Sequence, residues 1–471
     1  MGSYNVVVIG GGIAGLVAGL RACELGLRPV VLEKGTGTYL CNTRLTGGTF
    51  HLCSQDVLSD AAVLNDIIRK KSPTAVPAIA AAVSGEASRL VGWLKSVGVR
   101  FVSTGPAPAY RNVLSPPRIP KPGLHWQGRA GDVLLRTLEA RLRSLGGNMM
   151  LGARAVELLT SAGRCTGVVA EINGSKERFE ADAVVLADGG FQGNLDLLKK
   201  YVSPRPDRVF QRGASTAIGD GLQMAEAVGA KLTSLESFYG GVLSRDATTR
   251  ADLWPYPLLD PLCALGLVVN GAGRRFADEG ISGVYMANQI AKLDDPGSAF
   301  VIIDDAIWNG PAREYIIPAN PYLALANGTS FRAGTVEGLA RLASLPEQAL
   351  RETIDEHNRA FASDFTTALS TPRTTSPTRP WKLGSGQLHA IPLIAGITYT
   401  MGGIATDDRG RVLDRNDQPI AGLFASGTTT GGLEGGPTVS YVGGLTKSGT
   451  MSLRVAEQIA ADFKAHPVGA R

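Results

Sequence analysis

A glycine-rich turn near the start of the chain has the residue types and spacing needed to bind a dinucleotide. Gly10 permits a tight turn, Gly12 lets the backbone approach a pyrophosphate, and Gly15 allows a helix to pack closely on a strand. Glu33, further along the chain, can accept hydrogen bonds from both hydroxyl groups of a ribose. The pattern predicts a pyrophosphate at the N-terminus of a helix, where backbone N–H groups favour negative charge.

The elements that must position these residues occur in the expected order. An apolar strand over residues 5–9 leads into the glycine turn, an apolar helix follows, and a second strand over residues 29–32 ends at Glu33. A glycine triplet alone is weak evidence, because glycine turns occur in many α/β domains. Here strand, turn, helix, strand and acid occur together, so we predict an α/β, Rossmann-like domain.

Later segments are predicted to complete this domain. Residues 41–48 form a polar loop with paired glycines, suited to wrap the phosphates and ring edge of a cofactor. Residues 164–180 have the pattern of a hairpin turned at Asn173-Gly174, and residues 183–187 form a buried strand. A final helix over residues 450–463 returns the chain to the first domain.

The element pattern changes near Tyr239, which suggests a domain boundary. We divide the chain into residues 1–238 and 376–471, which form the dinucleotide domain, and residues 239–375, an inserted α+β cap that mixes aromatics, prolines and short helices. A loop over residues 103–123 is rich in proline and glycine. It is either a wall over the active site or a plain connector.

Composition narrows the class of protein. With 471 residues, 19% charged residues and a formal charge of +5 that is dispersed, the chain is not expected to bind nucleic acid. The five cysteines have no paired spacing, which argues against disulfides and metal centres and favours a reducing compartment. No apolar run is long enough to span a bilayer, so we expect a cytoplasmic protein without a membrane span.

Four segments in order resemble the fumarate reductase and succinate dehydrogenase flavoprotein family, which includes the 3-ketosteroid dehydrogenases. They are the glycine turn and residues 185–191, 400–403 and 422–427. The resemblance implies FAD in an extended form, with a cap inserted into the flavin domain and the active site between them. The family's covalently attached members use a histidine in the early loop, which is absent at Asn42-Thr43, so the FAD is expected to be noncovalent.

The resemblance also implies a set of cofactor-binding residues. Thr428 stands where the family has an acid after Gly427, which removes one expected contact to the ribityl chain. The residues implied are Gly10, Gly12, Ala14, Gly15, Glu33, Lys34, Thr43, Arg44, Gly47, Gly48, Val156, Asp188, Gly189, Asp220, Gly427, Gly444, Leu445 and Thr446.

The departures from the family pattern carry information about the substrate. Tyr399 stands where fumarate reductases have a histidine, Tyr441 where they have a substrate-binding arginine, and Trp308 at the place of their proton-donating arginine. Arginines match carboxylates because their guanidinium groups bind in a bidentate way. Without them, a dicarboxylate is not the expected substrate.

Tyr441 suits a different task. A phenol donates one directed hydrogen bond and can polarise a carbonyl without neutralising a full charge. In the ketosteroid dehydrogenases a tyrosine at this place shares the carbonyl with the N–H four residues later, which is Leu445 here. The alternative is that Tyr441 packs in the core with its hydroxyl satisfied.

A base is needed as well, because removal of two hydrogens from adjacent carbons takes a hydride acceptor at one carbon and a base at the other. The candidates are Tyr399, Tyr285, Tyr256 and His389. A free phenol titrates near 10 and would need a lowered pKa, whereas a histidine titrates in the useful range.

We therefore predict an FAD-dependent oxidoreductase acting on a CH–CH bond next to a carbonyl, by dehydrogenation or ene reduction. A 3-ketosteroid or another cyclic enone is the leading substrate by resemblance, and the electron donor or acceptor is open. A second hypothesis is a small unsaturated carboxylic acid held by Arg111, Arg118 or Arg274. A third is a flavoprotein module without turnover.

Overall fold

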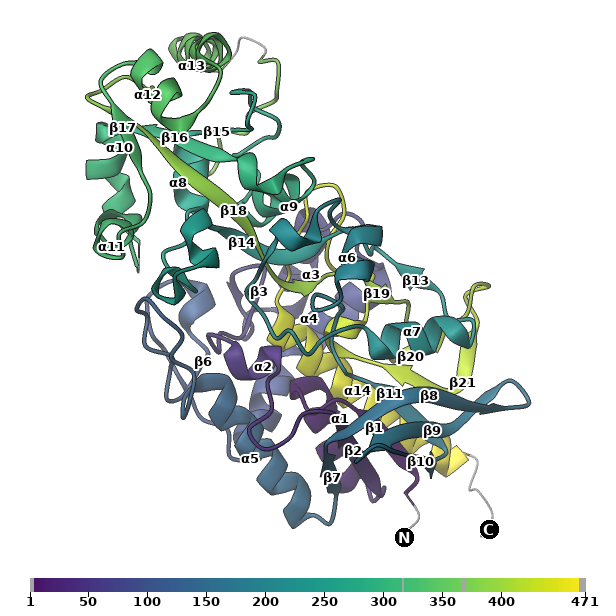
Figure 1. The fold of residues 1–471 in the computed structure, drawn as a ribbon. Helices are drawn as coiled ribbons and strands as arrows, with labels where there is room; N and C mark the ends of the chain where they lie inside the picture. Colours follow the sequence, from purple (N-terminus) through teal and green to yellow (C-terminus); the bar gives the residue numbers. More distant parts are fainter. Residues whose placement is uncertain (1–3, 316, 366–368, 466–471) are drawn as a thin grey trace.

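Two sheets organise the molecule, one in each lobe of Figure 1. The computed structural model describes residues 4–315, 317–365 and 369–465. The first and last described residues lie at the end of the first lobe away from the second (Figure 1). The mixed helix and strand content agrees with the α/β class predicted from the sequence.

The sheet of the first lobe has a parallel centre. β1 lies between β2 and β11, and β21 lies beside β11, all parallel. Val6 and Val8 of β1 pack on one face and Val7 and Ile9 on the other, so the strand is buried on both sides. The strands are β1 (Val6–Ile9), β2 (Pro29–Glu33), β7 (Asn148–Leu151), β8 (Ala153–Ser161), β9 (Arg164–Ile172), β10 (Ser175–Glu180), β11 (Ala183–Leu186), β20 (Arg411–Leu413) and β21 (Pro419–Ala425).

The predicted hairpin is confirmed. β9 and β10 pair antiparallel from Ile172 opposite Ser175, and the two residues between them, Asn173 and Gly174, both have positive φ. Such a two-residue turn matches the twist of the flanking strands.

Helices cover one face of this sheet, and α1, α4, α5 and α14 pack against one another there. The last helix, α14, begins at Gly444, earlier than the predicted residue 450, because Gly443 has a φ of 152° that ends the preceding loop. The helices of this lobe are α1 (Ile13–Glu24), α2 (Asn42–Leu45), α3 (Ala61–Lys71), α4 (Pro77–Ser96), α5 (Ala130–Ser144), α6 (Leu195–Tyr201), α7 (Asp220–Ala227) and α14 (Gly444–Ala465).

The second sheet is built around one long strand, β18, which pairs with β12, β14, β16 and β17. Figure 1 shows β18 running from the far end of the cap to the first lobe. Its strands are β12 (Phe210–Gln211), β14 (Phe238–Ser244), β15 (Leu267–Val269), β16 (Phe300–Asp304), β17 (Phe331–Ala333) and β18 (Leu388–Thr400). The helices around it are α8 (Asp260–Leu265), α9 (Gly283–Ala291), α10 (Asp305–Asn309), α11 (Ala319–Leu325), α12 (Val336–Ala343) and α13 (Glu347–Ala362).

The predicted domain boundary at residues 375/376 would place β18 in a different domain from β14 and β16, with which it pairs. We therefore propose that the cap extends to the end of β18, while the boundary near Tyr239 stays at the start of β14. Three two-stranded sheets complete the chain: β3 (His51–Leu52) with β4 (Gln55–Asp56), β5 (Phe101–Val102) with β6 (Val113–Leu114), and β13 (Leu232–Thr233) with β19 (Gly403–Ile404).

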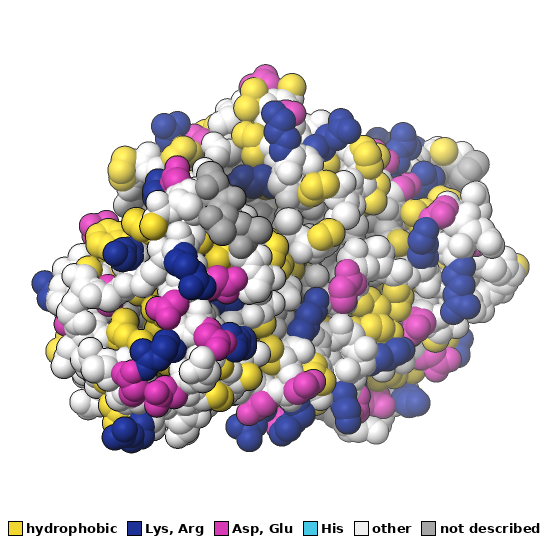
Figure 2. Space-filling model, turned by 90° about the horizontal axis from the view of Figure 1, so that it is seen from above, with side chains coloured by type: hydrophobic (Ala, Val, Ile, Leu, Met, Phe, Trp, Pro, Cys, Tyr) yellow, Lys and Arg dark blue, Asp and Glu magenta, His cyan; other side chains and the backbone are white. Residues whose placement is uncertain are grey.

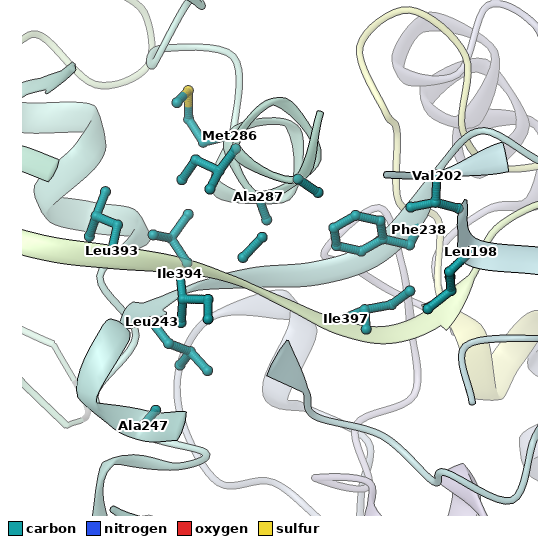
Figure 3. Packing of buried hydrophobic residues seen from close by; sticks show 14 of the residues in the cluster. Leu198, Val202, Phe238, Leu243, Ala247, Met286, Ala287, Leu393, Ile394 and Ile397 are labelled. Carbon is teal, nitrogen blue, oxygen red and sulfur yellow. The ribbon is translucent and has the colours of Figure 1, made fainter. Parts of the chain in front are cut away.

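A continuous apolar core joins the two lobes. Figure 3 shows Phe238 of β14 and Ile397 of β18 beside Leu198 and Val202, which come from the α6 region of the first lobe. Met286 of α9 belongs to the same core. The aromatic and charged residues carried by β14 and β18 are therefore held at a fixed place relative to the first lobe.

On the face seen in Figure 2, basic and acidic side chains are interspersed, and no large patch of the described residues carries charge of one sign. Among the described residues, no helix combines the length and the apolar character needed to cross a bilayer.

Candidate active site

A cavity of about 740 Å³ lies between the two lobes. At one end it is lined by the turn between β1 and α1, and at the other by residues of β14, α8 and the loop before α14. Cavities of this size hold small molecules and cofactors. We call these the cofactor end and the cap end.

The glycine turn has the geometry predicted for it. Gly10 has a φ of 104°, and a Cβ atom there would lie 2.5 Å from the carbonyl oxygen of Ala187. A Cβ atom on Gly15 would lie 1.8 Å from the carbonyl oxygen of Gly10, so helix and strand touch at this point. The Thr43 hydroxyl accepts a hydrogen bond of 3.1 Å from the N–H of Ile13. The N-terminus of α1 therefore faces the cavity.

Glu33 ends β2 at the wall of the cavity and is almost fully buried. Its Oε2 accepts a 2.7 Å hydrogen bond from the N–H of Gly11, and its Oε1 accepts one of 2.7 Å from the N–H of Gly35. These two N–H groups hold the carboxylate in place, and its remaining lone pairs can accept ribose hydroxyl groups.

Two further acids stand on the same side of the cavity. Asp220 is held by Lys34, at 2.7 Å, and by Arg154, at 2.7 Å. Asp188 accepts a 2.8 Å hydrogen bond from the N–H of Gly221, but its buried Oδ1 has no partner among the described residues. Burial raises the pKa of Asp188 to about 6. A buried, unsatisfied carboxyl oxygen at the cavity wall indicates that a bound group supplies its partner.

Most of the predicted cofactor residues line the cavity. They are Gly10, Gly12, Ala14, Glu33, Lys34, Thr43, Gly47, Gly48, Asp188, Gly189, Asp220, Gly427, Gly444 and Leu445. Gly15 does not line the cavity. It lies behind the cavity wall, where it lets α1 contact the backbone at Gly10.

Arg44, Val156 and Thr446 do not line it. The Arg44 side chain turns to Asp132 and lies 4.8 Å from the ring centre of Tyr39. Val156 falls at an irregularity of β8 and faces a different depression, although its neighbours Arg154 and Ala155 reach the cavity. Thr446 is buried inside the first turn of α14. These three residues, implied by the family resemblance, therefore stay predicted contacts without a place in the cavity lining.

Three tyrosines meet at the cap end. Tyr239 and Tyr399 are cross-strand neighbours on β14 and β18, with ring centres 5.3 Å apart. Tyr441, from the loop before α14, stacks on Tyr239 at 4.0 Å. All three line the cavity. The structure thus brings together two of the predicted catalytic tyrosines, and adds Tyr239, which the sequence did not single out.

The hydroxyl of Tyr441 lies at the N-terminus of α14. Its oxygen accepts a 3.3 Å hydrogen bond from the N–H of Gly444, and Leu445 lines the cavity next to it. Burial, with Tyr239 and Glu434 adding to it, raises the pKa of Tyr441 well above its usual range. The phenol is therefore neutral near pH 7, and no described residue accepts its proton.

Behind Tyr399 lies a buried charged pair that sequence reasoning missed. Glu434 accepts hydrogen bonds from the Tyr399 hydroxyl at 3.0 Å, from Lys447 Nζ at 3.2 Å and from the N–H groups of Val442 and Gly443 at 2.9 and 3.1 Å. Burial and the Glu434 charge raise the pKa of Tyr399 well above 10. The one available signal was a glutamate inside a run of glycines.

The other predicted bases lie elsewhere. Tyr285 packs beside the tyrosine cluster but does not line the cavity, whereas Tyr256 does. His389 pairs with Asp305 at 2.9 Å, and its ring lies 5.6 Å from that of Trp308. A strand rises about 3.3 Å per residue, so His389 is about 33 Å along β18 from Tyr399. We therefore correct the assignments of His389 and Trp308, which are structural residues of the cap.

Only one of the three arginines predicted to bind a carboxylate lines the cavity. Arg118 lines the cavity, but Arg111 pairs with Asp56 and Arg274 with Glu352 at exposed sites. Ala109, Tyr110 and Arg118 show that the proline-rich loop is a wall of the cavity rather than a plain connector. Arg212, not singled out from the sequence, also lines it.

The model of one protein family, described as an FAD binding domain, matches residues 5–438. Among curated relatives, the vinyl phenol reductase of Lactiplantibacillus plantarum is 26% identical, with 97% of each chain covered. The 4-oxocyclohexanecarboxylate 2-dehydrogenase of Sinomonas cyclohexanicum is 27% identical over 91% of this chain and 88% of that protein. Fumarate reductases are also among the relatives.

A solved structure has the same fold. The 3-ketosteroid-Δ4-(5α)-dehydrogenase of Rhodococcus jostii RHA1, crystallised with 4-androstene-3,17-dione, superposes with a TM-score of 0.73 over 97% of both chains. The sequences are 23% identical, so this likeness concerns the fold.

Proposed function

The chain belongs to the FAD binding domain family, and we propose from this premise that it adds or removes hydrogen across a carbon–carbon bond next to the carbonyl of a cyclic ketone. Its family and relatives make it an FAD-dependent oxidoreductase acting on CH–CH groups.

The cofactor end suits FAD. The N-terminus of α1 would take the pyrophosphate, Glu33 the ribose, and the unsatisfied Oδ1 of Asp188 a donor of the cofactor. When bound, FAD exchanges a hydride with one carbon of the substrate. The early loop offers no histidine at Asn42-Thr43, so we propose noncovalent binding.

One observation carries the proposed reaction: Tyr441 lines the cavity, and its neutral hydroxyl lies beside the start of α14. A carbonyl oxygen placed there would accept a hydrogen bond from the phenol and a second from the Leu445 N–H, which lies in the first helical turn. Both donors stabilise negative charge on that oxygen, so they acidify the neighbouring C–H.

Tyr399 and Glu434 would handle the proton. Tyr399 lines the cavity, and its hydroxyl donates to Glu434, which Lys447 also contacts. This buried chain can hold the proton that leaves or joins the carbon next to the carbonyl. Since burial keeps the Tyr399 phenol protonated at neutral pH, the resting enzyme is arranged to donate a proton.

The substrate class follows from the lining of the cap end. Tyr239, Trp254, Tyr256 and Leu258 present aromatic and aliphatic surface suited to a ring. A relative that acts on 4-oxocyclohexanecarboxylate supports a cyclic ketone. The electron partner stays open. All five cysteines are free, and on that ground we propose a reducing compartment such as the cytoplasm.

Anaerobic mixing tests the proposal. We expect cyclic ketones to bleach the visible absorbance of the oxidised FAD-loaded protein, or cyclic enones to restore it after reduction with dithionite. Succinate and fumarate serve as the comparison pair and should do neither. A response to fumarate alone would contradict the proposed function.

A further inference from the structure

We propose that Arg118 and Arg212 form a carboxylate-binding site at the cap end of the cavity, so that the substrate carries a carboxylate in addition to its carbonyl. The inference rests on the proposed function, because it concerns the same cavity. It assigns a second recognition point, separate from Tyr441, to two arginines that line the cavity.

The Arg212 side chain packs against two glycines. Gly241 of β14 and Gly396 of β18 are cross-strand partners. A Cβ atom on Gly396 would lie 2.3 Å from the Cδ of Arg212, and one on Gly241 would lie 2.9 Å from its Nη1. The side chain therefore lies flat on a stretch of sheet that has no side chains of its own. Any larger residue at either glycine would displace the guanidinium group.

Arg118 reaches the cavity from the loop on the other wall. Its Nη1 donates a 2.7 Å hydrogen bond to the carbonyl oxygen of Leu45, which fixes the direction of the guanidinium group. Burial lowers the pKa of Arg118, and the positive charge of Arg212 adds to this effect. The two cations are thus close enough to interact across the cavity, with Tyr256 beside them.

Neither arginine makes an ion pair with a described residue. Within residues 4–315, 317–365 and 369–465, no carboxylate lies within 4.0 Å of either side chain, and the buried Nε of Arg212 has no hydrogen-bond partner. Two neighbouring, partly buried cations without a partner are costly unless an anion joins them.

Asp260 is an acidic group that lines the cavity near Arg212. Its Oδ1 accepts a 3.2 Å hydrogen bond from the N–H of Val242, and its Oδ2 has no partner in the described chain. Burial raises the pKa of Asp260, against the opposing effect of Arg212. A Cβ atom on Gly241 would lie 2.9 Å from Arg212 Nη1 and 3.1 Å from Asp260 Oδ2, so the two side chains face the same glycine. In its protonated form Asp260 could donate a hydrogen bond to a carboxylate bound there.

A carboxylate fits this arrangement because a planar guanidinium group binds it through two parallel hydrogen bonds. With the carbonyl at Tyr441 and the carboxylate at the arginines, the apolar middle of the substrate would lie on Tyr239 and Tyr256. The substrate class is therefore a cyclic oxo acid rather than a dicarboxylate or a neutral ketone.

Binding of a non-reacting probe tests the site without requiring turnover. We would titrate the FAD-loaded protein with cyclohexanecarboxylate and with its methyl ester, following the visible spectrum of the bound FAD and the thermal midpoint. We expect the acid to bind roughly tenfold or more tightly than the ester, since hydrogen bonds to charged groups are strong. Equal binding of acid and ester would overturn the proposal.

Variants locate the effect. Arg212→Gln and Arg118→Gln should each weaken acid binding about tenfold and leave the ester unchanged, while Arg212→Lys should retain part of the affinity. Gly396→Ala should act like Arg212→Gln, because it displaces the side chain without removing it. Arg111→Gln, at an exposed arginine outside the cavity, is the matched control. Acid binding that survives the Arg118→Gln/Arg212→Gln double variant, with FAD content intact, would also overturn the proposal.

Measurements of turnover distinguish a failure of this inference from a failure of the proposed function. If the acid probe binds through the arginines but no cyclic oxo acid or ketone changes the redox state of FAD, the proposed reaction fails and the carboxylate site stands. If neutral cyclic ketones react as fast as the oxo acids, with equal KM, the reaction stands and the carboxylate site fails.

Discussion

The cofactor end of the cavity is shaped by the backbone of the short turn between β1 and α1, whereas at the cap end side chains from three distant segments meet. Gly10 and Gly15 shape the first end by leaving no room for a Cβ atom. Tyr239, Tyr399 and Tyr441 meet at the second end with Glu434 behind them.

This difference has an energetic consequence. At the cofactor end, two backbone N–H groups hold Glu33, while Asp220, on the same side of the cavity, is held by Lys34 and Arg154. At the cap end a buried carboxylate is held by a buried ammonium group, and removal of one partner leaves an uncompensated charge. Changes at the first end should therefore act through shape, and changes at the second through electrostatics.

The largest effect is expected at the shape-dependent end. Gly15→Val would place side-chain atoms against the backbone at Gly10, so the helix could not pack on the strand and the FAD site would not form. We expect purified Gly15→Val to lack visible absorbance and to release no FAD on acid precipitation. Gly85→Ala is the control, since the site on α4 has open space and alanine favours helix. A Gly15→Val protein that is yellow would contradict the claim that shape controls the cofactor end.

Next in size is the buried pair at the electrostatic end. Glu434→Gln should lower the free energy of unfolding by about 3–5 kcal/mol, because it leaves Lys447 buried without its counterion. Lys447→Met should restore part of that loss in the double variant. Urea unfolding of the four proteins of this cycle measures the coupling. Strictly additive effects would mean that the pair is not the unit that holds the tyrosines.

A smaller, pH-dependent effect is expected at His51, which lines the cavity with its ring 5.5 Å from that of Tyr441. Burial lowers the pKa of His51 from 6.5 to about 4, against the opposing charge of Glu434. Between these values the unfolded chain binds a proton that the folded chain does not, so stability is lost as pH falls from 6.5 to about 4. Urea unfolding at several pH values should show a weaker pH dependence for His51→Gln than for the parent, and identical dependences would refute the assignment.

The sequence predicted the cofactor end well because its determinants are local. The glycine turn, the strand before it and Glu33 at the end of β2 lie in one βαβ unit, whose geometry follows from the φ angle at Gly10 and the contact at Gly15. Arg44, Val156 and Thr446 stay predicted contacts that do not line the cavity, because which face of a short helix or an irregular strand points toward it depends on tertiary packing.

At the cap end the sequence identified residues but not their neighbours. Tyr399 and Tyr441 were found as departures from a family pattern, whereas Tyr239, Glu434 and Arg212 depend on the pairing of β14 with β18, which no local pattern reveals. His389 was misplaced for the same reason. Its closeness in sequence to Tyr399 becomes a large separation in space, because β18 is a single extended strand of 13 residues.

The most direct test of the tyrosine-based account is the rate at which a reactive cyclic ketone bleaches the FAD-loaded Tyr441→Phe protein under anaerobic conditions. The Tyr201→Phe protein, altered at a tyrosine away from the cavity, is the control. Loss of the phenol should slow the reaction by about a hundredfold or more, with FAD content and ketone affinity nearly unchanged. Bleaching of Tyr441→Phe at the parent rate would contradict the account.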